Sequence, residues 1–330
     1  MTSAYPTLAS VKNEIESEIN AYIHSLTLLS SLREYFKSRG IDCHIEPKIK
    51  KKSGDPSAPD LLLHANNFLI VDHKYTQSTD QRTLSNKISE MKKYDAFFLL
   101  FDDGSQTEVE TKPEVVMLTP EKNIPIFKTL SNCPITWGYV LEENIELRQS
   151  IGSVKDSRVL SLFTPTLSCP LSTEIAKYKF IISHPPTPYT AVQVYSFLWT
   201  LIQPTQLFAP EFEVKYDDIL TVFNSFFPPW LRPEIRQMSV KRLEEAIDLL
   251  QKVGWIRWYK QENLILVDKT KGRLIPDISA YLIDNFVKIE HAKKVKKYEG
   301  KVKERKIPEK GVGQTSLMSF FKLNADSPKG

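Results

Sequence analysis

Between Ser10 and Arg39, apolar side chains recur every three or four positions, which is the spacing of one face of an α-helix. The hydroxyl of Ser10 can cap the first turn, and Gly40 can end the helix in a left-handed conformation. The pattern therefore predicts one long amphipathic helix over Ser10–Arg39. The residues of its apolar stripe are Ile15, Ile19, Tyr22, Leu26 and Leu29.

Beyond this helix the apolar residues are gathered in short runs, which is typical of strands. Leu61–Leu63 and Phe68–Val71 are two such runs, and the polar connection His64–Asn67 between them contains two asparagines. A short connection of this kind between apolar runs predicts a β-hairpin. We expect the open end of this hairpin to bring Asp60 close to Asp72.

The elements around the hairpin predict an α/β domain. A helix, three strands, a second helix and a strand follow one another, and further strands extend the same sheet. We place this domain at residues 1–150. Its other elements are predicted at Ile41–Ile49 (strand), Thr79–Tyr94 (helix), Ala96–Phe101 (strand buried on both faces), Val115–Leu118, Ile135–Leu141 and Ile145–Ile151 (strands).

The next part of the chain has a different character. Residues 151–188 are rich in Ser, Thr and Pro, so we interpret them as a connector with one strand at Tyr178–Ile182. Residues 189–290 are mostly helical and include a second hairpin. The elements predicted there are helices at Tyr189–Ile202, Tyr216–Phe226, Val240–Val253 (capped by Ser239) and Pro276–Glu290, and strands at Trp255–Tyr259 and Leu264–Val267.

Charge is distributed unevenly along the 330 residues. The net charge is only +4, but Lys288–Lys310 holds ten Lys or Arg residues against four Glu. A tract of like charges that contains Gly300 and Pro308 is expected to stay disordered and to attract polyanions. We therefore interpret residues 291–330 as a flexible basic tail.

Composition narrows the class of protein. The chain is 41% apolar and 25% charged, as soluble globular proteins are, and no apolar stretch is long enough to span a membrane. The three cysteines, Cys43, Cys133 and Cys169, are far apart, which disfavours a zinc ribbon or a disulfide framework. We therefore expect an intracellular protein with no membrane partner.

The ends of the first hairpin carry the candidate chemistry. Asp60 opens its first strand, and Asp72 and Lys74 close its second strand and share one face of the sheet. Two carboxylates and an ammonium at one rim favour a divalent-metal site, because Mg²⁺ takes hard oxygen ligands and keeps several waters. A surface ion pair beside a structural hairpin is the alternative. His73 points to the opposite face, where we expect it to pack.

Pro59-Asp60, followed after eleven residues by Asp72-His73-Lys74, resembles the motif of the PD-(D/E)XK nuclease superfamily. Triplets with an acid and a lysine at this spacing are common here, but only the copy at 72–74 follows a Pro-Asp strand across a short turn. The other copies are Glu46-Pro47-Lys48, Glu90-Met91-Lys92, Glu110-Thr111-Lys112 and Glu213-Val214-Lys215.

The resemblance covers residues 10–140 and implies a restriction-endonuclease-like αβββαβ core. It also implies phosphodiester hydrolysis that depends on Mg²⁺, with Mn²⁺ as a substitute. It assigns Asp60 and Asp72 to the metal and Lys74 to the attacking water. A glutamate of the first helix often completes such a site, and Glu18 is the candidate here, with Glu14 second.

Basic residues supply the expected DNA contacts. A breaker-rich loop before the hairpin contains three lysines that can meet phosphates, although a solvated loop is the alternative. These lysines are Lys50, Lys51 and Lys52.

Three helices followed by a hairpin resemble a winged-helix module. In such a module, Lys241 and Arg242 at the start of the third helix and Arg257 on the wing would contact DNA. The same helix carries acidic residues, so a protein partner is the alternative.

A separate motif lies near the C-terminus. Phe320 and Phe321 stand in a polar tail with no core to join, so they indicate an anchor for a partner. Together with Leu317 they fall on one side of a helical turn, and Gln314 precedes them at a fixed spacing. This pattern resembles the PIP box, by which DNA-processing proteins bind the ring-shaped sliding clamp of the PCNA type.

These features predict a metal-dependent DNA endonuclease of repair, replication or recombination that is recruited by a PCNA-type clamp. Such clamps imply an archaeal cytoplasm or a eukaryotic nucleus. A non-catalytic adaptor that uses an inactive nuclease-like fold is the alternative function. Resolvase-like members of the superfamily commonly dimerise to make paired cuts, so a homodimer is one option for this chain.

Overall fold

The computed structural model describes residues 5–51, 56–75, 85–86, 88–89, 94, 97–100, 106–130, 133–182, 184–229, 233–271 and 277–306. Helices and strands are mixed along the chain, as predicted, and the largest sheet has both parallel and antiparallel neighbours. The chain divides into two compact units, one of Met1–Ile15 with Ile283–Gly330 and one of Glu16–Leu282.

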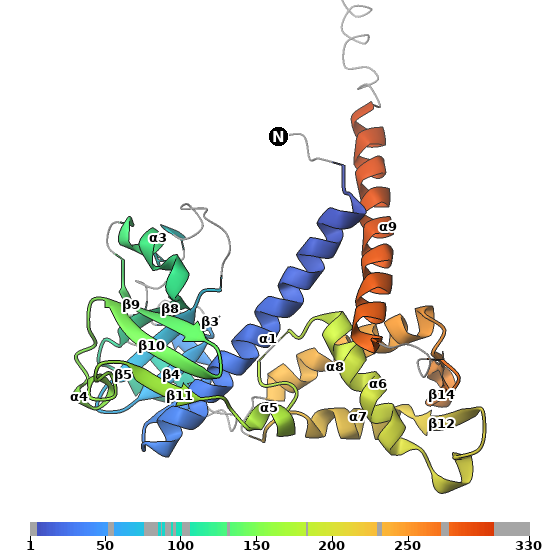
Figure 1. Ribbon diagram of the computed structural model, residues 1–330, viewed down its shortest axis with the longest axis horizontal. Coiled ribbons are helices and arrows are strands. Elements are labelled where there is room, and N and C mark those ends of the chain that lie inside the picture. Colours follow the sequence, from blue (N-terminus) through green and yellow to red (C-terminus); the bar gives the residue numbers. More distant parts are fainter. Residues whose placement is uncertain are drawn as a thin grey trace, which may run out of the picture. The chain divides into compact units, whose positions relative to one another are not determined.

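The larger unit contains a seven-stranded sheet with the order β1-β4-β5-β8-β9-β10-β11 (Figure 1). β5 pairs with β8 and β8 with β9 in parallel, whereas the other neighbours are antiparallel. A parallel pair needs a crossover, which residues 74–113 provide between β5 and β8. The strands are β1 (Asp42–Ile45), β4 (Leu61–His64), β5 (Phe68–His73), β8 (Glu114–Pro120), β9 (Ile135–Leu141), β10 (Asn144–Ile151) and β11 (Leu167–Pro170).

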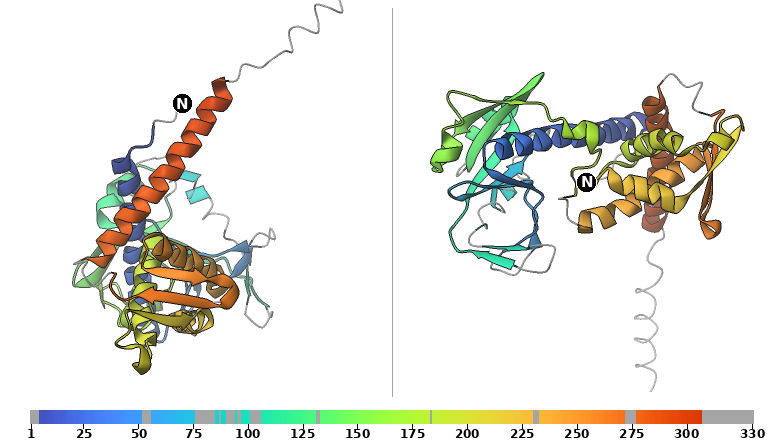
Figure 2. Two further views of the ribbon diagram at one scale, coloured as in Figure 1. Left: turned by 90° about the vertical axis from the view of Figure 1, so that its right-hand side faces the viewer. Right: turned by 90° about the horizontal axis from the view of Figure 1, so that it is seen from below.

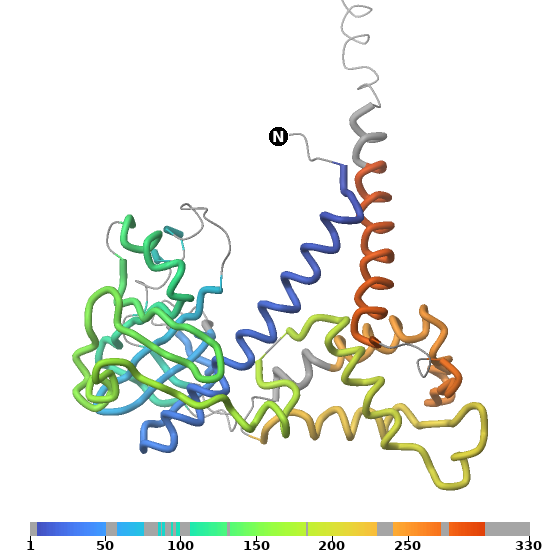
Figure 3. The backbone as a smooth tube through the Cα atoms, in the orientation of Figure 1, coloured from blue at the N-terminus to red at the C-terminus, as the bar shows by residue number. Residues whose placement is uncertain are grey.

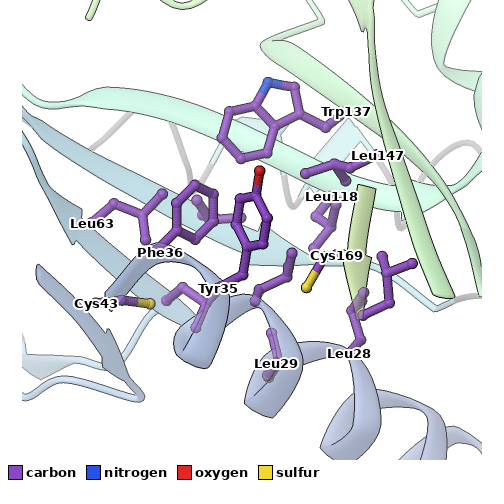
Figure 4. Packing of buried hydrophobic residues seen from close by; sticks show 14 of the residues in the cluster. Leu28, Leu29, Tyr35, Phe36, Cys43, Leu63, Leu118, Trp137, Leu147 and Cys169 are labelled. Atoms are coloured by element: carbon purple, nitrogen blue, oxygen red, sulfur yellow. The ribbon is translucent and has the colours of Figure 1, made fainter. Parts of the chain in front are cut away.

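Helix α1 (Leu8–Ser38) confirms the long helix predicted from the sequence. From Tyr22 to Phe36 its apolar side chains pack on one face of the sheet, as Figure 4 shows for Phe36 beside Leu63. Burial of such large side chains is the main stabilising term for this pair of layers.

The C-terminal end of α1 agrees with the prediction, whereas the N-terminal end does not. Gly40 adopts φ +70° after the last turn, as predicted. The predicted cap at Ser10 is wrong by one turn, because Thr7 and Ser10 exchange hydrogen bonds. The amide of Ser10 donates to Thr7 Oγ1 (3.1 Å), and the amide of Thr7 donates to Ser10 Oγ (3.2 Å).

A four-stranded sheet with the order β3-β2-β6-β7 adds its apolar residues to the other side of the hairpin. Ile49 and Phe97 of this small sheet cluster with Leu62 and Ile70. The strands are β2 (Ile49–Lys51), β3 (Pro56–Ser57), β6 (Phe97–Leu100) and β7 (Gln106–Val109).

Two strand predictions are corrected by this sheet. The strand predicted at Ile41–Ile49 is two strands in different sheets, because the backbone turns at Glu46, where φ is 44°. The strand at Ala96–Phe101 forms as β6, but in the small sheet, and β8 lies beside β5 instead. Apolar content alone does not say which sheet a buried strand joins. Most of the helix predicted at Thr79–Tyr94 lies outside the described residues.

The domain boundary predicted after residue 150 cuts through the main sheet, because β11 pairs with β10. Short helices α4 (Ser157–Leu160) and α5 (Glu174–Lys177) flank β11. The strand predicted at Tyr178–Ile182 is wrong, since none of these described residues lies in a strand, and Ile181 and Ile182 join the core beneath α1.

The helical part of this unit follows the order helix, strand, helix, helix, strand, strand, and its three strands form a sheet β12-β14-β13 (Figure 2). The predicted helices and hairpin are confirmed, whereas the short strand β12 was missed. Ser239 lies inside α8 rather than capping it. The elements are α6 (Thr187–Leu198), β12 (Glu211–Lys215), α7 (Tyr216–Ser225), α8 (Pro233–Lys252), β13 (Ile256–Tyr259) and β14 (Leu264–Asp268).

In the smaller unit, the first turns of α1 lie beside α9 (Ile278–Lys306; Figure 3). Lys12 Nζ lies 2.8 Å from Asp284 Oδ1, and Lys294 pairs with Glu14. The prediction that the basic tract is disordered from residue 291 is therefore wrong as far as Lys306, because lysine and glutamate favour helices and α1 supplies partners. No helix within the described ranges has the length and apolarity to cross a bilayer.

Candidate active site

The open end of the first hairpin places two carboxylates opposite one another. β4 pairs with β5 so that Leu61 faces Val71, and continuing this register by one residue sets Asp60 opposite Asp72. The amide of His73 donates to Asp60 Oδ2 at 2.6 Å, and the amide of Glu46 donates to the Asp60 carbonyl at 3.0 Å. The structure therefore places Asp60 opposite Asp72, as predicted, and hydrogen bonds from neighbouring backbone amides hold Asp60 there.

The two carboxylates lie at the edge where β5, β8 and β9 end. Asp72 is 2% exposed and has the parity of Ile70, so it points to the face away from α1. Lys74 follows β5, where its amide donates to the Leu118 carbonyl (2.7 Å) and its carbonyl accepts from Thr119 Oγ1 (3.0 Å). The carboxyl edge of parallel strands is where ligands of α/β proteins commonly bind.

Electrostatics single out Asp60. Burial, with the neighbouring charge of Asp72 as the next cause, raises the pKa of Asp60 to about 7, although the His73 amide and the Lys74 ammonium act to lower it. Glu46 also raises this pKa, so a third carboxylate lies within electrostatic reach. Negative charge gathered in a buried place favours a bound cation.

The donor set fits a hard divalent cation. Carboxylate oxygens are the protein ligands that Mg²⁺ and Mn²⁺ prefer, and Mg²⁺ is often held by one or two carboxylates with waters in the remaining positions. Asp60 and Asp72 meet this requirement. No group of three or more His, Cys, Asp or Glu residues in the described ranges is arranged to hold a metal ion. Any metal here would therefore rely on water for much of its coordination.

The structure does not bring the predicted first-helix glutamates to this pair. Glu14 is engaged by Lys294 in the smaller unit. Glu18 is exposed on α1, which covers the opposite face of the sheet. It also precedes Ser25, the residue that contacts His73, by seven positions, or about 10 Å along the helix axis. Glu46 lies within electrostatic reach of Asp60, but it does not complete a three-residue metal site with Asp60 and Asp72.

His73 packs on the opposite face, as predicted. Its Nε2 lies 2.7 Å from Tyr139 Oη, and its Nδ1 lies 3.2 Å from Ser25 Oγ. Burial lowers the pKa of His73 to about 3, with smaller effects from His24 and Lys74. The imidazole is therefore neutral, and His73 contributes its backbone amide to the carboxylate side of the sheet.

The residues predicted to contact DNA differ in their exposure and in their side-chain partners. Lys50 is exposed on β2, whereas Lys52 and the side chain of Lys51 lie outside the described residues. Lys241 is exposed at the middle of α8. The other two predicted contacts are engaged by carboxylates, since Arg242 binds Glu245 Oε2 (2.7 Å) and Arg257 binds Glu211 Oε2 (2.6 Å). The clamp motif, residues 314–321, lies outside the described part of the chain.

Comparison with known proteins adds no family to these observations. No protein-family model matches the chain, and no curated protein or solved structure is significantly similar to it. The chemistry of the site itself is therefore the basis for a functional assignment.

Proposed function

We propose that this protein is a Mg²⁺-dependent DNA endonuclease. The observation that carries the proposal is the pair of carboxylates, Asp60 and Asp72, facing each other at the carboxyl edge of β5 beside Lys74. This arrangement agrees with the roles that the PD-(D/E)XK resemblance implies for the same three residues. The parallel β5–β8 pair and the helix on one face of the sheet also suit a restriction-endonuclease-like core.

Each group has a chemical role in phosphodiester hydrolysis. Asp60 and Asp72 would hold the cation, which would lower the pKa of a bound water and balance charge on the phosphate. The His73 amide keeps Asp60 Oδ2 in place. Lys74 orients the attacking water and stabilises the negative charge that develops on the phosphate oxygens. The charge of Lys74 acts to lower the pKa of Asp60, so its ammonium lies within electrostatic reach of the carboxylates.

We expect the helical part of the protein to contribute to DNA binding. Its element order and its strand order β12-β14-β13 favour the winged-helix resemblance of the sequence. Lys241 is exposed on α8, and Lys260 lies after β13 with its ammonium 4.0 Å from the centre of the Trp258 ring. Arg257 would have to exchange Glu211 for a phosphate. These features favour contacts with the phosphate backbone, which carry no sequence information.

We propose a PCNA-type clamp as the partner that brings the enzyme to DNA. The sequence motif Gln314, Leu317, Phe320 and Phe321 carries this part of the proposal. Tethering through a tail raises the local concentration of the nuclease near DNA without any new contact between the nuclease and DNA.

The test is cleavage of a labelled panel of branched, nicked, mismatched and single-stranded DNAs. Each DNA is incubated with Mg²⁺, Mn²⁺ or EDTA, with and without the clamp. Lys74→Ala and Asp72→Asn are compared with Lys155→Ala, which removes an exposed lysine whose backbone amide binds Glu114 at the opposite end of β8.

We expect metal-dependent cutting by the wild type and by Lys155→Ala, and loss of cutting in the two site variants with unfolding midpoints close to the wild type. Cutting that survives in both site variants would refute the assignment of these residues. If no DNA is cut while the clamp still binds, the non-catalytic adaptor is the better description of the protein.

A further inference from the structure

A pocket of about 290 Å³ lies at the same strand edge as the carboxylates, on the α1 side of the sheet. Tyr75 follows Lys74 by one residue, so the two side chains leave the chain on opposite faces. The pocket is lined by His24, Tyr75, Pro120, Glu121, Lys122, Tyr139, Val140 and Leu141. The proposed reaction uses none of these residues.

Aromatic rings form much of this wall. The ring centres of His24 and Tyr75 are 4.4 Å apart, and those of His24 and Tyr139 are 5.4 Å apart. Pro120, the last residue of β8, and Leu141, the last residue of β9, add apolar surface to the pocket. Tyr75 and His24 are both partly exposed, so their rings are accessible from the pocket. Such a wall suits a flat, uncharged aromatic ligand.

The hydrogen-bonding groups of the aromatic wall, Tyr139 and His24, are neutral, whereas Glu121 and Lys122 add charged groups to the lining. Tyr139 Oη lies 2.7 Å from His24 Nε2 and 2.7 Å from His73 Nε2. One hydroxyl proton serves one of these nitrogens, so Tyr139 donates to one ring and accepts from the other. Burial, with the charge of Lys122, lowers the pKa of His24, which keeps its imidazole neutral as well. The neutral aromatic part of the wall favours a base, and the carboxylate of Glu121 disfavours a buried phosphate.

We propose that this pocket binds one unpaired nucleobase of the DNA strand whose phosphate is cleaved at Asp60, Asp72 and Lys74. The inference rests on the proposed endonuclease function. A strand crossing this edge can present its phosphate to Lys74 and turn the adjacent base across the edge to stack on Tyr75 and His24. Lys122, exposed at the pocket, then meets the phosphate on the far side of that base.

The proposal has a consequence for substrate choice. A base reaches the pocket only after it leaves its stack, which costs a few kcal/mol in intact duplex and least where the base is mismatched or already single-stranded. Stacking on aromatic rings accepts every base, because each has a π-face. The enzyme would therefore prefer unpaired or distorted DNA and show little base preference at this position.

The test uses an oligonucleotide that carries the fluorescent base 2-aminopurine in a single-stranded segment. The full-length protein is titrated in EDTA, so binding is read without cleavage. A second oligonucleotide has an abasic position in place of 2-aminopurine, with a label elsewhere. Tyr75→Ala removes the stacking ring, and Tyr75→Phe keeps the ring and removes only the hydroxyl. Tyr5→Ala, in the smaller unit, is the matched control for loss of an exposed tyrosine.

We expect quenching of 2-aminopurine by the wild type, Tyr75→Phe and Tyr5→Ala, and its loss in Tyr75→Ala. Base stacking is worth about 1–3 kcal/mol, so Tyr75→Ala and the abasic DNA should each weaken binding about 5- to 150-fold. Equal affinity for the abasic DNA, quenching that survives in Tyr75→Ala, or no DNA binding would overturn the proposal. Because binding is measured in EDTA, Tyr75-dependent quenching without cleavage would retain the base pocket and refute the nuclease alone.

Discussion

Replacing Asp60 by Asn tests the electrostatics on which the metal site depends. The change removes one of two facing carboxylates and keeps an oxygen that can accept the hydrogen bond from the His73 amide. In the absence of metal, the wild-type pair repels, so we expect Asp60→Asn to be more stable than the wild type at pH 8.

The magnitude follows from the raised pKa of Asp60. Holding a carboxylate whose pKa is about 7 instead of 3.8 costs the folded state on the order of 4 kcal/mol at pH 8. Asp60 is partly exposed, and water relaxes around it, so we expect a measured gain of about 1–2 kcal/mol. This corresponds to a rise of a few degrees in the unfolding midpoint.

The pH dependence gives the sign of the effect. Between about pH 4 and pH 7 the folded protein holds a proton on Asp60 that the unfolded chain has lost. Wild-type stability therefore falls as the pH rises through this window, and Asp60→Asn lacks this contribution. The gain should be smaller at pH 5 than at pH 8, where it reaches its full value.

The assay is thermal unfolding at pH 5 and pH 8, in EDTA and in Mg²⁺. Asp42→Asn, which neutralises an exposed carboxylate in β1, is the control and should show no such pattern. Mg²⁺ should stabilise the wild type and leave Asp60→Asn unchanged, because a ligand stabilises only the state that binds it. A variant that is less stable than the wild type to the same extent at both pH values would refute the reasoning.

Three further predictions concern other parts of the molecule. Asp156→Ala should lower the free energy of unfolding, measured in urea, by about 3 kcal/mol, because one carboxylate oxygen accepts hydrogen bonds from two amides of the β4–β5 turn and the other caps α4. Asp156→Asn should lower this free energy less. Lys269→Met should speed proteolysis at residues 203–210, because the buried ammonium donates hydrogen bonds to the carbonyl oxygens of Gln206 and Leu207 in that loop. Unchanged cleavage would contradict this. Changing Phe320 and Phe321 to Ala together should abolish clamp binding in calorimetry while clamp-independent cutting persists; retained binding would remove the tail from the proposal.

The sequence by itself determined the local elements and one long-range pairing. The periodicity of α1, the β4–β5 hairpin and the helices of the second part all follow from neighbours in the chain, where spacing decides which side chains share a face. The meeting of Asp60 with Asp72 was also within reach, because a tight turn of a few residues fixes the register of the strands it joins.

Only the tertiary structure decided which strand lies next to β5 and which acid lies near Asp60. β6 and β8 are both apolar and both follow the hairpin, but β8 pairs with β5 and β6 covers the other face. The PD-(D/E)XK resemblance implies Glu18, yet α1 covers the face away from the carboxylates, whereas Glu46 lies within electrostatic reach of Asp60. The base pocket likewise joins residues from α1, β9 and the ends of β5 and β8. Contacts between residues so far apart in the sequence depend on how helices and sheets pack against one another, and composition and periodicity do not encode this packing.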